Sequence, residues 1–311
     1  MSPVLNHEPS EIRRLGEGLL KRLARLLPEQ KPVNWDKVYA ATWTPTLLSN
    51  TGGTLQAHTG TDPIELNDLF CIDAQKRSIV LNTRQFLAGY PANNVLLWGA
   101  RGTGKSSLIH ALLNEYQAQG LRLIEVRKEG LSGLPWIVEQ VHGKPYRFIL
   151  VCDDLSFEAD DPTYKTLKSV LEGSVFKASE NVLIYATSNR RHLLPESMSD
   201  NLAARMEQGE LHEGEAIEEK ISLSDRFGLW LSFYPFRQEA YLTVLDHWLS
   251  KLARENGLPL DWLTPQQQEL LHTEGLAWAR SRGVRSGRTA QYFARHTIGQ
   301  QLLKNNIKKN Q

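Results

Sequence analysis

Short apolar runs alternate with stretches of helical periodicity along the middle of this chain. The runs have four to seven residues and end in turn-forming or polar residues, which is typical of buried strands. The predicted strands are residues 95–98, 121–126, 148–152, 181–187 and 229–233. Strands that alternate with helices predict a parallel sheet covered on both faces. We therefore expect an α/β fold built on a five-stranded parallel sheet sandwiched by helices.

The segments on either side of this core have different patterns. Residues 8–27 carry leucine and isoleucine at helical spacing with basic residues around them, which predicts an amphipathic helix. Residues 28–65 have weak periodicity and many turn formers, as in a connection between domains. From Gln238 onward, helical periodicity continues without a further strong strand. We expect an N-terminal helical extension and linker over 1–65, a core over 66–237, and a small helical lid with a short basic tail over 238–311.

The bulk composition excludes several classes of protein. The 311 residues are 41% hydrophobic and 23% charged, and a formal net charge of +1 gives no field that would demand nucleic acid or an acidic membrane. No apolar run approaches the roughly 20 residues of a membrane span, and the first residues lack the apolar core of a signal peptide. Cys71 and Cys152 are too few for a disulfide framework or a zinc site. We expect a cytoplasmic protein without a membrane span.

The most specific motif in the sequence follows the first predicted strand. It satisfies the pattern G-x-x-x-x-G-K-[ST], and a predicted helix from about Lys105 to Gln119 begins within it. The glycines let backbone N–H groups point at phosphate oxygens, Lys105 supplies a charge for the outer phosphates, and Ser106 supplies a hydroxyl for magnesium. A glycine-rich turn that binds nothing is the alternative, but such a turn does not need the Lys-Ser pair. The expected nucleotide-binding residues are Gly99, Ala100, Arg101, Gly102, Thr103, Gly104, Lys105, Ser106 and Ser107.

Polar side chains also follow the third and fourth predicted strands. Asp153 and Asp154 end the third strand, where a P-loop protein places a carboxylate that helps to hold magnesium. We expect Asp153 on the metal side and Asp154 to orient or deprotonate the attacking water, with Glu158 as a reserve for that base. Asn189 follows the fourth strand, at the sheet edge that faces ligands in open α/β folds, and could hold the same water. The alternatives are a helix cap for the aspartates and an ordinary turn for the asparagine.

The loop at 99–106, the strand end at 149–154 and Asn189 together resemble the AAA+ ATPases. That resemblance implies that Asn189 acts as the residue called sensor 1. Residues 223–228, with the sequence LSDRFG, resemble the arginine-finger segment of branch-migration motors. The resemblance implies that Arg226 reaches into the nucleotide site of the next subunit, where a guanidinium stabilises charge on the transferring phosphoryl group.

A second arginine segment resembles part of the lid of Clp-type unfoldases. Residues 283–288, with the sequence GVRSGR, are similar to the sensor 2 segment of those proteins. The resemblance implies that Arg285 contacts the nucleotide from the lid, with Arg288 as the second choice. Ordinary surface arginines are the alternative for this pair.

The chain from Leu69 to about Phe293 resembles more closely an uncharacterised, mostly bacterial family of predicted AAA+ ATPases, known only as a domain of unknown function. The phrases that carry this resemblance are NVLLWGARGTGKSSL, FILVCDDLSFE, LIYATSNRRHLLPE and EKISLSDRFGLWLSF. It implies the fold and the ATPase class but no cellular role. Two departures from the common pattern are Asp154 in place of Glu and the long acidic segment 197–220. After the second predicted strand there is no aromatic-glycine motif of the kind with which unfolding motors grip a chain.

The sequence therefore predicts an AAA+ ATPase that binds ATP and Mg²⁺ and works as a homo-oligomeric ring or partial ring. Its output would be the remodelling or loading of a protein or nucleic-acid partner that the sequence does not name. Two other functions stay open. A P-loop kinase for a small molecule would need an acceptor pocket and no arginine from a neighbouring subunit. A nucleotide-dependent switch or scaffold would hydrolyse little, which the shorter side chain of Asp154 would permit.

Overall fold

The computed structural model describes residues 32–46, 52–58, 60, 62–157, 161–171, 180–190, 193, 223–259 and 262–309. Contacts divide the chain into two compact units, Met1–Asn34 and Trp35–Gln311, and all the elements described below belong to the second unit. The predicted helix over 8–27, the reserve base Glu158 and the acidic segment 197–220 lie outside the described residues.

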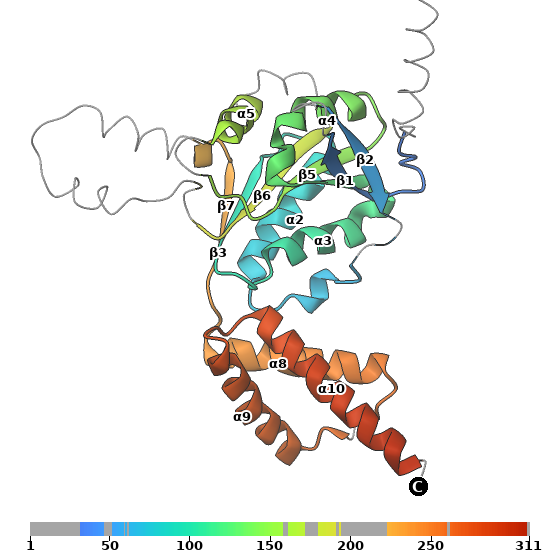
Figure 1. Cartoon of the computed structure of the whole chain (residues 1–311), viewed down its shortest axis with the longest axis vertical. Coiled ribbons are helices and arrows are strands. Elements are labelled where there is room, and N and C mark those ends of the chain that lie inside the picture. The colour runs from blue at the N-terminus through green and yellow to red at the C-terminus, as the bar shows by residue number, and fades with distance from the viewer. Residues whose placement is uncertain are drawn as a thin grey trace, which may run out of the picture. The chain divides into compact units, whose positions relative to one another are not determined.

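A seven-stranded sheet forms the centre of the second unit (Figure 1). The strands are β1 (Ala40–Pro45), β2 (Gly53–His58), β3 (Val95–Gly99), β4 (Leu121–Val126), β5 (Arg147–Cys152), β6 (Val182–Ser188) and β7 (Leu229–Phe233). They lie in the order β2-β1-β4-β5-β6-β3-β7, and every neighbouring pair is parallel except β1 with β2. The carboxyl ends of β3, β5 and β6 therefore meet at one edge of the sheet, where the polar groups predicted from the sequence follow them.

The sheet has two strands more than the five that the sequence predicts, and this corrects the expected fold. Both extra strands come from the segment that we expected to be a linker. β1 reads AATWTP and buries only Ala41 and Trp43, and no residue of β2 is fully buried, so neither forms the continuous apolar run of a central strand. By its contacts, the second compact unit begins at Trp35 and includes both strands, whereas the boundary expected from the sequence lies at residue 65.

The segment after β4 packs onto β1 instead of projecting from the sheet. It forms the 3₁₀ helix η3 (Lys128–Gly133) and continues into α4 (Leu134–Val141). Gly130 and Gly133 lie so close to the indole of Trp43 that a Cβ on either would overlap the ring. These glycines are therefore explained by the packing of a buried tryptophan.

Helices cover both faces of the sheet, as the alternating pattern predicts. The remaining elements of this part are η1 (Leu66–Asp68), α2 (Asp73–Leu87), α3 (Lys105–Tyr116), η2 (Gln117–Gln119) and α5 (Pro162–Leu171). Figure 1 shows α2 and α3 on one face of the sheet and α4 and α5 on the opposite face. α3 follows β3 directly, so the loop between them is short and its two ends are held by regular structure.

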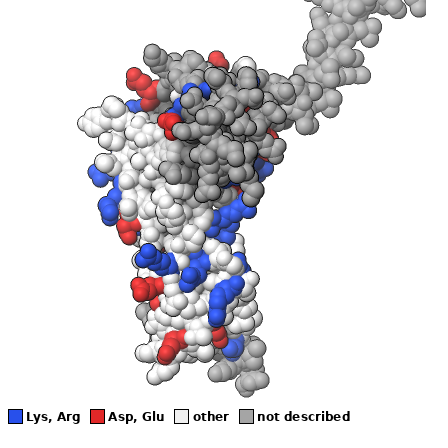
Figure 2. Space-filling view, turned by 90° about the vertical axis from the view of Figure 1, so that its left-hand side faces the viewer, with Lys and Arg blue, Asp and Glu red and all other residues white. Residues whose placement is uncertain are grey.

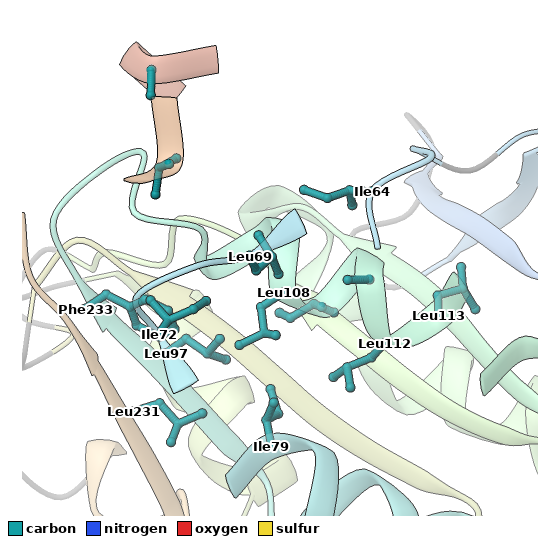
Figure 3. Close-up of a cluster of buried hydrophobic side chains, with 14 of the residues drawn as sticks. Ile64, Leu69, Ile72, Ile79, Leu97, Leu108, Leu112, Leu113, Leu231 and Phe233 are labelled. Carbon is teal, nitrogen blue, oxygen red and sulfur yellow. The ribbon is translucent and has the colours of Figure 1, made fainter. Parts of the chain in front are cut away.

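The core between the sheet and the helices α2 and α3 holds that loop in position. Leu97 on β3 lies near Leu108 on α3 and Ile79 on α2, and Phe233 on β7 lies beside Ile72 (Figure 3). All of these side chains are almost completely buried. Leu112 continues the same face of α3 one turn later. Truncating a side chain such as Leu108 to alanine would cost about 2–5 kcal/mol, so α3 and β3 are firmly packed on either side of the loop.

Three helices follow β7, where the sequence shows helical periodicity. They are α8 (Gln238–Glu255), α9 (Pro265–Ser281) and α10 (Gly287–Lys309). Thr264 caps α9 in a capping box with Gln267, and Gly275 lets α9 approach Leu245 of α8 closely.

On the face shown in Figure 2, basic and acidic side chains are interspersed over these helices, so neither sign dominates there. Among the helices that the structure describes, none combines the length and the apolar character needed to cross a membrane.

Candidate functional site

The loop after β3 has a backbone that favours glycine at three positions. Gly99, Gly102 and Gly104 have φ angles of 127°, 75° and 101°, in the left-handed region. A Cβ on Gly99 would overlap the carbonyl of Phe233, and a Cβ on Gly102 would lie 2.8 Å from Ser286 Oγ. The Ala100 amide donates to Phe233 O at 2.9 Å. Contacts with β7 and with the start of α10 thus hold the loop in the curled form that the motif predicts.

Lys105, the first residue of α3, is enclosed within this loop. Its Nζ donates to Gly99 O and Ala100 O at 2.8 Å each and to Asn189 Oδ1 at 3.3 Å, and the residue is only 7% exposed. Burial lowers the pKa of the Lys105 ammonium, and the negative charges of Asp153 and Asp154 partly oppose that shift. These three hydrogen-bond acceptors are neutral oxygens, so an anion that enters the loop gains a strong interaction with the Lys105 ammonium.

Asp153 connects the loop to two strand ends. Its Oδ1 accepts hydrogen bonds from Ser106 Oγ at 2.7 Å and from Thr187 Oγ1 at 2.6 Å. Thr187 Oγ1 also accepts from the Asp154 amide at 2.9 Å. Thr187 belongs to this site although the sequence analysis did not select it, and its place just before Asn189 at the end of a buried strand was the available signal. The hydroxyl and the carboxylate that the sequence assigned to metal binding are therefore adjacent.

Asp154 has an unusual backbone and two side-chain partners. Its φ angle is 52°, which costs a residue with a Cβ about 1–3 kcal/mol and places it at a turn fixed by the bond to Thr187. The Asn189 amide donates to the Asp154 carboxylate, and Arg101 lies 3.7 Å from it. Because both side chains of the Arg101–Asp154 pair are more than half exposed, this ion pair contributes little to stability. The carboxylate is thus held in place yet accessible from the cavity.

A cavity of about 390 Å³ lies between this edge of the sheet and the helices α8 and α10. The loop residues 101–107 line it together with Asp153, Asp154 and Asn189. Its other wall includes residues that the sequence analysis did not select. These are Phe70, Phe236, Trp248, Tyr292 and Arg295. Positions 288, 292 and 295 share one face of α10 by helical spacing. The place of Tyr292 and Arg295 on this wall could therefore be predicted from the sequence if Arg288 lies at the cavity.

The structure separates the two candidate lid arginines. Arg288 lines the cavity, and its backbone amide donates to Gly102 O at 3.2 Å. Arg285 is exposed and does not line the cavity, and its carbonyl accepts from the Phe236 amide at 3.0 Å. The second choice from the sequence, Arg288, is therefore the arginine at the cavity. The contacts of this segment with the loop are made by Ser286 and Arg288, immediately after Arg285.

Arg226 lies at the opposite edge of the sheet from the loop. It precedes β7, and the register pairs Leu229 with Val95 and Phe233 with Gly99. The loop begins at the Gly99 end, so the whole of β7 separates it from Arg226, a distance of roughly 16 Å at about 3.3 Å per residue. Arg226 therefore does not reach the cavity of its own chain, and any role at a nucleotide site concerns the site of another chain.

The parallel sheet, the P-loop after its β3 strand, the polar ends of β5 and β6 and the adjoining helical lid together define a P-loop protein of the AAA+ type. The chain belongs to the family described as "Protein of unknown function (DUF815)", whose family model matches residues 36–301. This match confirms the family resemblance seen in the sequence and extends it toward the N-terminus, so that β1 and β2 are included. No curated protein matches the sequence.

Among solved structures, the similarities are distant. The Holliday junction branch migration motor RuvB from Thermotoga maritima is 14% identical, with a TM-score of 0.41 over 76% of this chain and 72% of that chain. The ORC1 protein from Aeropyrum pernix, solved in complex with DNA, is 16% identical, with a TM-score of 0.45 over 71% of this chain and 57% of that chain. The ORC2 protein from Aeropyrum pernix, in ADPNP-ADP complexes, is 12% identical, with a TM-score of 0.46 over 77% of this chain and 70% of that chain.

Proposed function

We propose that this protein is an AAA+ ATPase that binds ATP in the cavity beside Lys105 and couples hydrolysis to work on a macromolecular partner. One observation carries the proposal: Lys105, Ser106, Asp153 and Asn189 come from three separate segments and meet around one curled loop. The loop amides and Lys105 supply the charges that a triphosphate needs, and the dipole of α3 adds to them.

Magnesium would be held by Ser106 and Asp153. Hydroxyl and carboxylate oxygens are ligands that Mg²⁺ prefers, and these two lie 2.7 Å apart at the end of the loop. No group of three or more His, Cys, Asp or Glu side chains among the described residues is arranged to hold a metal by itself. Phosphate oxygens of the nucleotide would supply the other ligands of the magnesium ion. The bound ion would neutralise part of the phosphate charge.

Asp154 and Asn189 are the groups best placed to bind and deprotonate the attacking water. Both line the cavity, and the hydrogen bond from Asn189 orients the Asp154 carboxylate. Asp154 would accept a proton from the water while Asn189 holds it near the outer phosphate. Glu158 stays the reserve candidate for the base. Arg288 would contact the phosphates from the lid, with Arg285 in a supporting position outside the cavity.

The site would be completed by Arg226 of a second copy. Since Arg226 does not reach its own cavity, a catalytic role for it requires a homo-oligomer in which the amino edge of one sheet faces the carboxyl edge of the next. The partner on which such a ring or partial ring acts would be a protein or a nucleic acid.

A nucleotide-dependent switch with little hydrolysis is the second candidate. The observation that favours it is the Asp154 carboxylate, which already accepts from Asn189 and pairs with Arg101. A carboxylate whose oxygens already contact these partners is less available to accept a hydrogen bond from an attacking water. A small-molecule kinase stays the less favoured alternative, since no described feature marks an acceptor for the phosphoryl group.

Replacing Lys105 tests the proposal most directly. Lys105→Ala should abolish ATP binding and turnover, because the buried ammonium is the charge at the centre of the loop. Calorimetric titration with ATP and Mg²⁺ measures binding, and phosphate release measures turnover. Lys165→Ala, which removes an exposed lysine from α5, is the matched control and should change neither. Unchanged affinity and rate in Lys105→Ala would remove the nucleotide site. ATP binding without measurable phosphate release in the unaltered protein would favour the switch.

A further inference from the structure

A buried carboxylate outside the P-loop ties the sheet part of the molecule to the lid. Asp68, at the end of η1, has a side chain that is only 4% exposed. Lys251 Nζ lies 2.5 Å from its Oδ2 and His247 Nε2 lies 3.0 Å from its Oδ1, and both partners belong to the lid helix α8. The Glu65 amide also donates to Oδ2 at 2.9 Å. One carboxylate thus joins the segment before α2 to the middle of α8.

The charge on Asp68 is stabilised by these partners. Burial by itself raises the pKa of a carboxyl group, but hydrogen bonds from Lys251, the Glu65 amide and His247 outweigh it, and the pKa of Asp68 lies below its usual value. An ionised carboxylate that is buried without partners raises the free energy of the folded protein. Moving α8 away from η1 would therefore either expose the Asp68 carboxylate to water or leave it buried without Lys251 and His247.

The same contacts shape one wall of the cavity. Asp68 itself lines the cavity, and so do Phe70 and Trp248, two residues that adjoin the ion pairs. The ring of Phe70 packs against the imidazole of His247 with centroids 4.6 Å apart, and the His247 and Trp248 rings lie 5.5 Å apart. The aromatic wall is therefore assembled only when η1 and α8 are held together.

The lid has a separate attachment to the phosphate side of the cavity. There the Arg288 amide bonds to Gly102 O, and Phe236 bonds to Arg285 O. One apolar cluster also includes residues of both parts, among them Leu69, Ile72, Val244 and Trp248. The Asp68 contact adds a charged attachment farther along α8, at Lys251 and His247.

We propose that Asp68, with Lys251 and His247, forms a latch that positions α8 over the cavity, so that nucleotide release requires the latch to open. Asp68 is a positioning residue in this proposal, acting through Phe70 and Trp248. The proposal rests on the proposed function for its ligand, a nucleotide. By linkage, a nucleotide that contacts the assembled wall also stabilises the latch.

Asp68→Asn tests the latch because it removes the charge and keeps the size of the side chain. We expect ADP carrying a fluorescent group on its ribose to dissociate about tenfold faster from Asp68→Asn than from the unaltered protein, as for an ordinary coupling between sites. Hydrogen–deuterium exchange without nucleotide should rise in residues 62–70 and in α8. Stopped-flow displacement measures the first effect and mass spectrometry the second.

Asp246→Asn is the matched control. Asp246 also lies on α8 and accepts from His272 at 2.7 Å and Gln268 at 2.9 Å, but these partners belong to the lid helix α9. It should leave nucleotide release and the exchange of residues 62–70 unchanged. Equal effects from both variants, or no effect from Asp68→Asn, would overturn the latch. Should Asp68→Asn fail to fold, His247→Gln and His247→Ala replace it, because glutamine keeps a donor and should preserve slow release while alanine should not.

The two proposals fail in different ways. If the unaltered protein binds no labelled nucleotide, the proposed function is wrong, and the exchange comparison alone then decides on the latch because it needs no ligand. If nucleotide binds and Lys105→Ala abolishes binding, while Asp68→Asn changes neither release nor exchange, only the latch is wrong.

Discussion

The two walls of the cavity are built in different ways. The sheet wall consists of side chains that bond to one another within short range: Lys105 to its own loop, and Ser106 and Thr187 to Asp153. The lid wall combines exposed side chains such as Arg288 and Tyr292 with the buried Trp248, and its helices contact the loop and Asp68. In the proposed function, the sheet wall would fix the phosphates and the lid wall would respond to them.

The largest expected effect tests the rigidity of the sheet wall. Gly99→Ala places a Cβ into the Phe233 carbonyl at a φ of 127°, so we expect a loss of about 4 kcal/mol or more, enough to unfold many domains. Gly143→Ala is the control, because Gly143 has a φ of 70° but open space around it and should lose only about 1 kcal/mol. Chemical denaturation measures both, and similar losses would mean that the loop is less constrained than its contacts indicate.

The next effect asks whether the two walls of one chain make a complete site. Arg226→Ala should leave ATP affinity largely intact and lower the hydrolysis rate, by about a thousandfold if the arginine stabilises the transition state. Mixing Arg226→Ala with Asp154→Ala protein should restore part of the activity, since a mixed oligomer contains sites with both groups. Native mass spectrometry must first detect the mixed oligomer. A protein that is strictly monomeric with and without ATP would contradict a site shared between two chains. So would mixed oligomers that recover no activity.

The smallest effect tests the lid wall. Arg288→Ala should weaken ATP binding by about fivefold to tenfold, as expected for one exposed guanidinium near a phosphate, whereas Arg285→Ala should change it by less than about twofold. Calorimetric titration of both variants provides the measurement. A larger effect from Arg285 than from Arg288 would mean that α10 begins differently when nucleotide is bound.

The sequence predicted the sheet wall of the cavity better than it predicted the lid wall. The five predicted strands, the P-loop and the meeting of Ser106 with Asp153 were readable because each depends on a local pattern or on one known property of parallel sheets. β1 and β2 were missed because alternation with threonine and an exposed edge do not produce an apolar run. Thr187 was missed because its role depends on two partners, Asp153 and the Asp154 amide, that lie more than thirty positions earlier.

By itself, the sequence determined the class of this protein, because the P-loop and the strands around it are short-range patterns with a specific chemistry. The tertiary structure decided which polar residues outside those patterns belong to the cavity. It placed Arg288 on the cavity wall and Arg285 outside it, put Arg226 at the far edge of the sheet, and paired Asp68 with α8. Each of these depends on contacts between residues far apart in the chain, and such contacts leave no periodic signal.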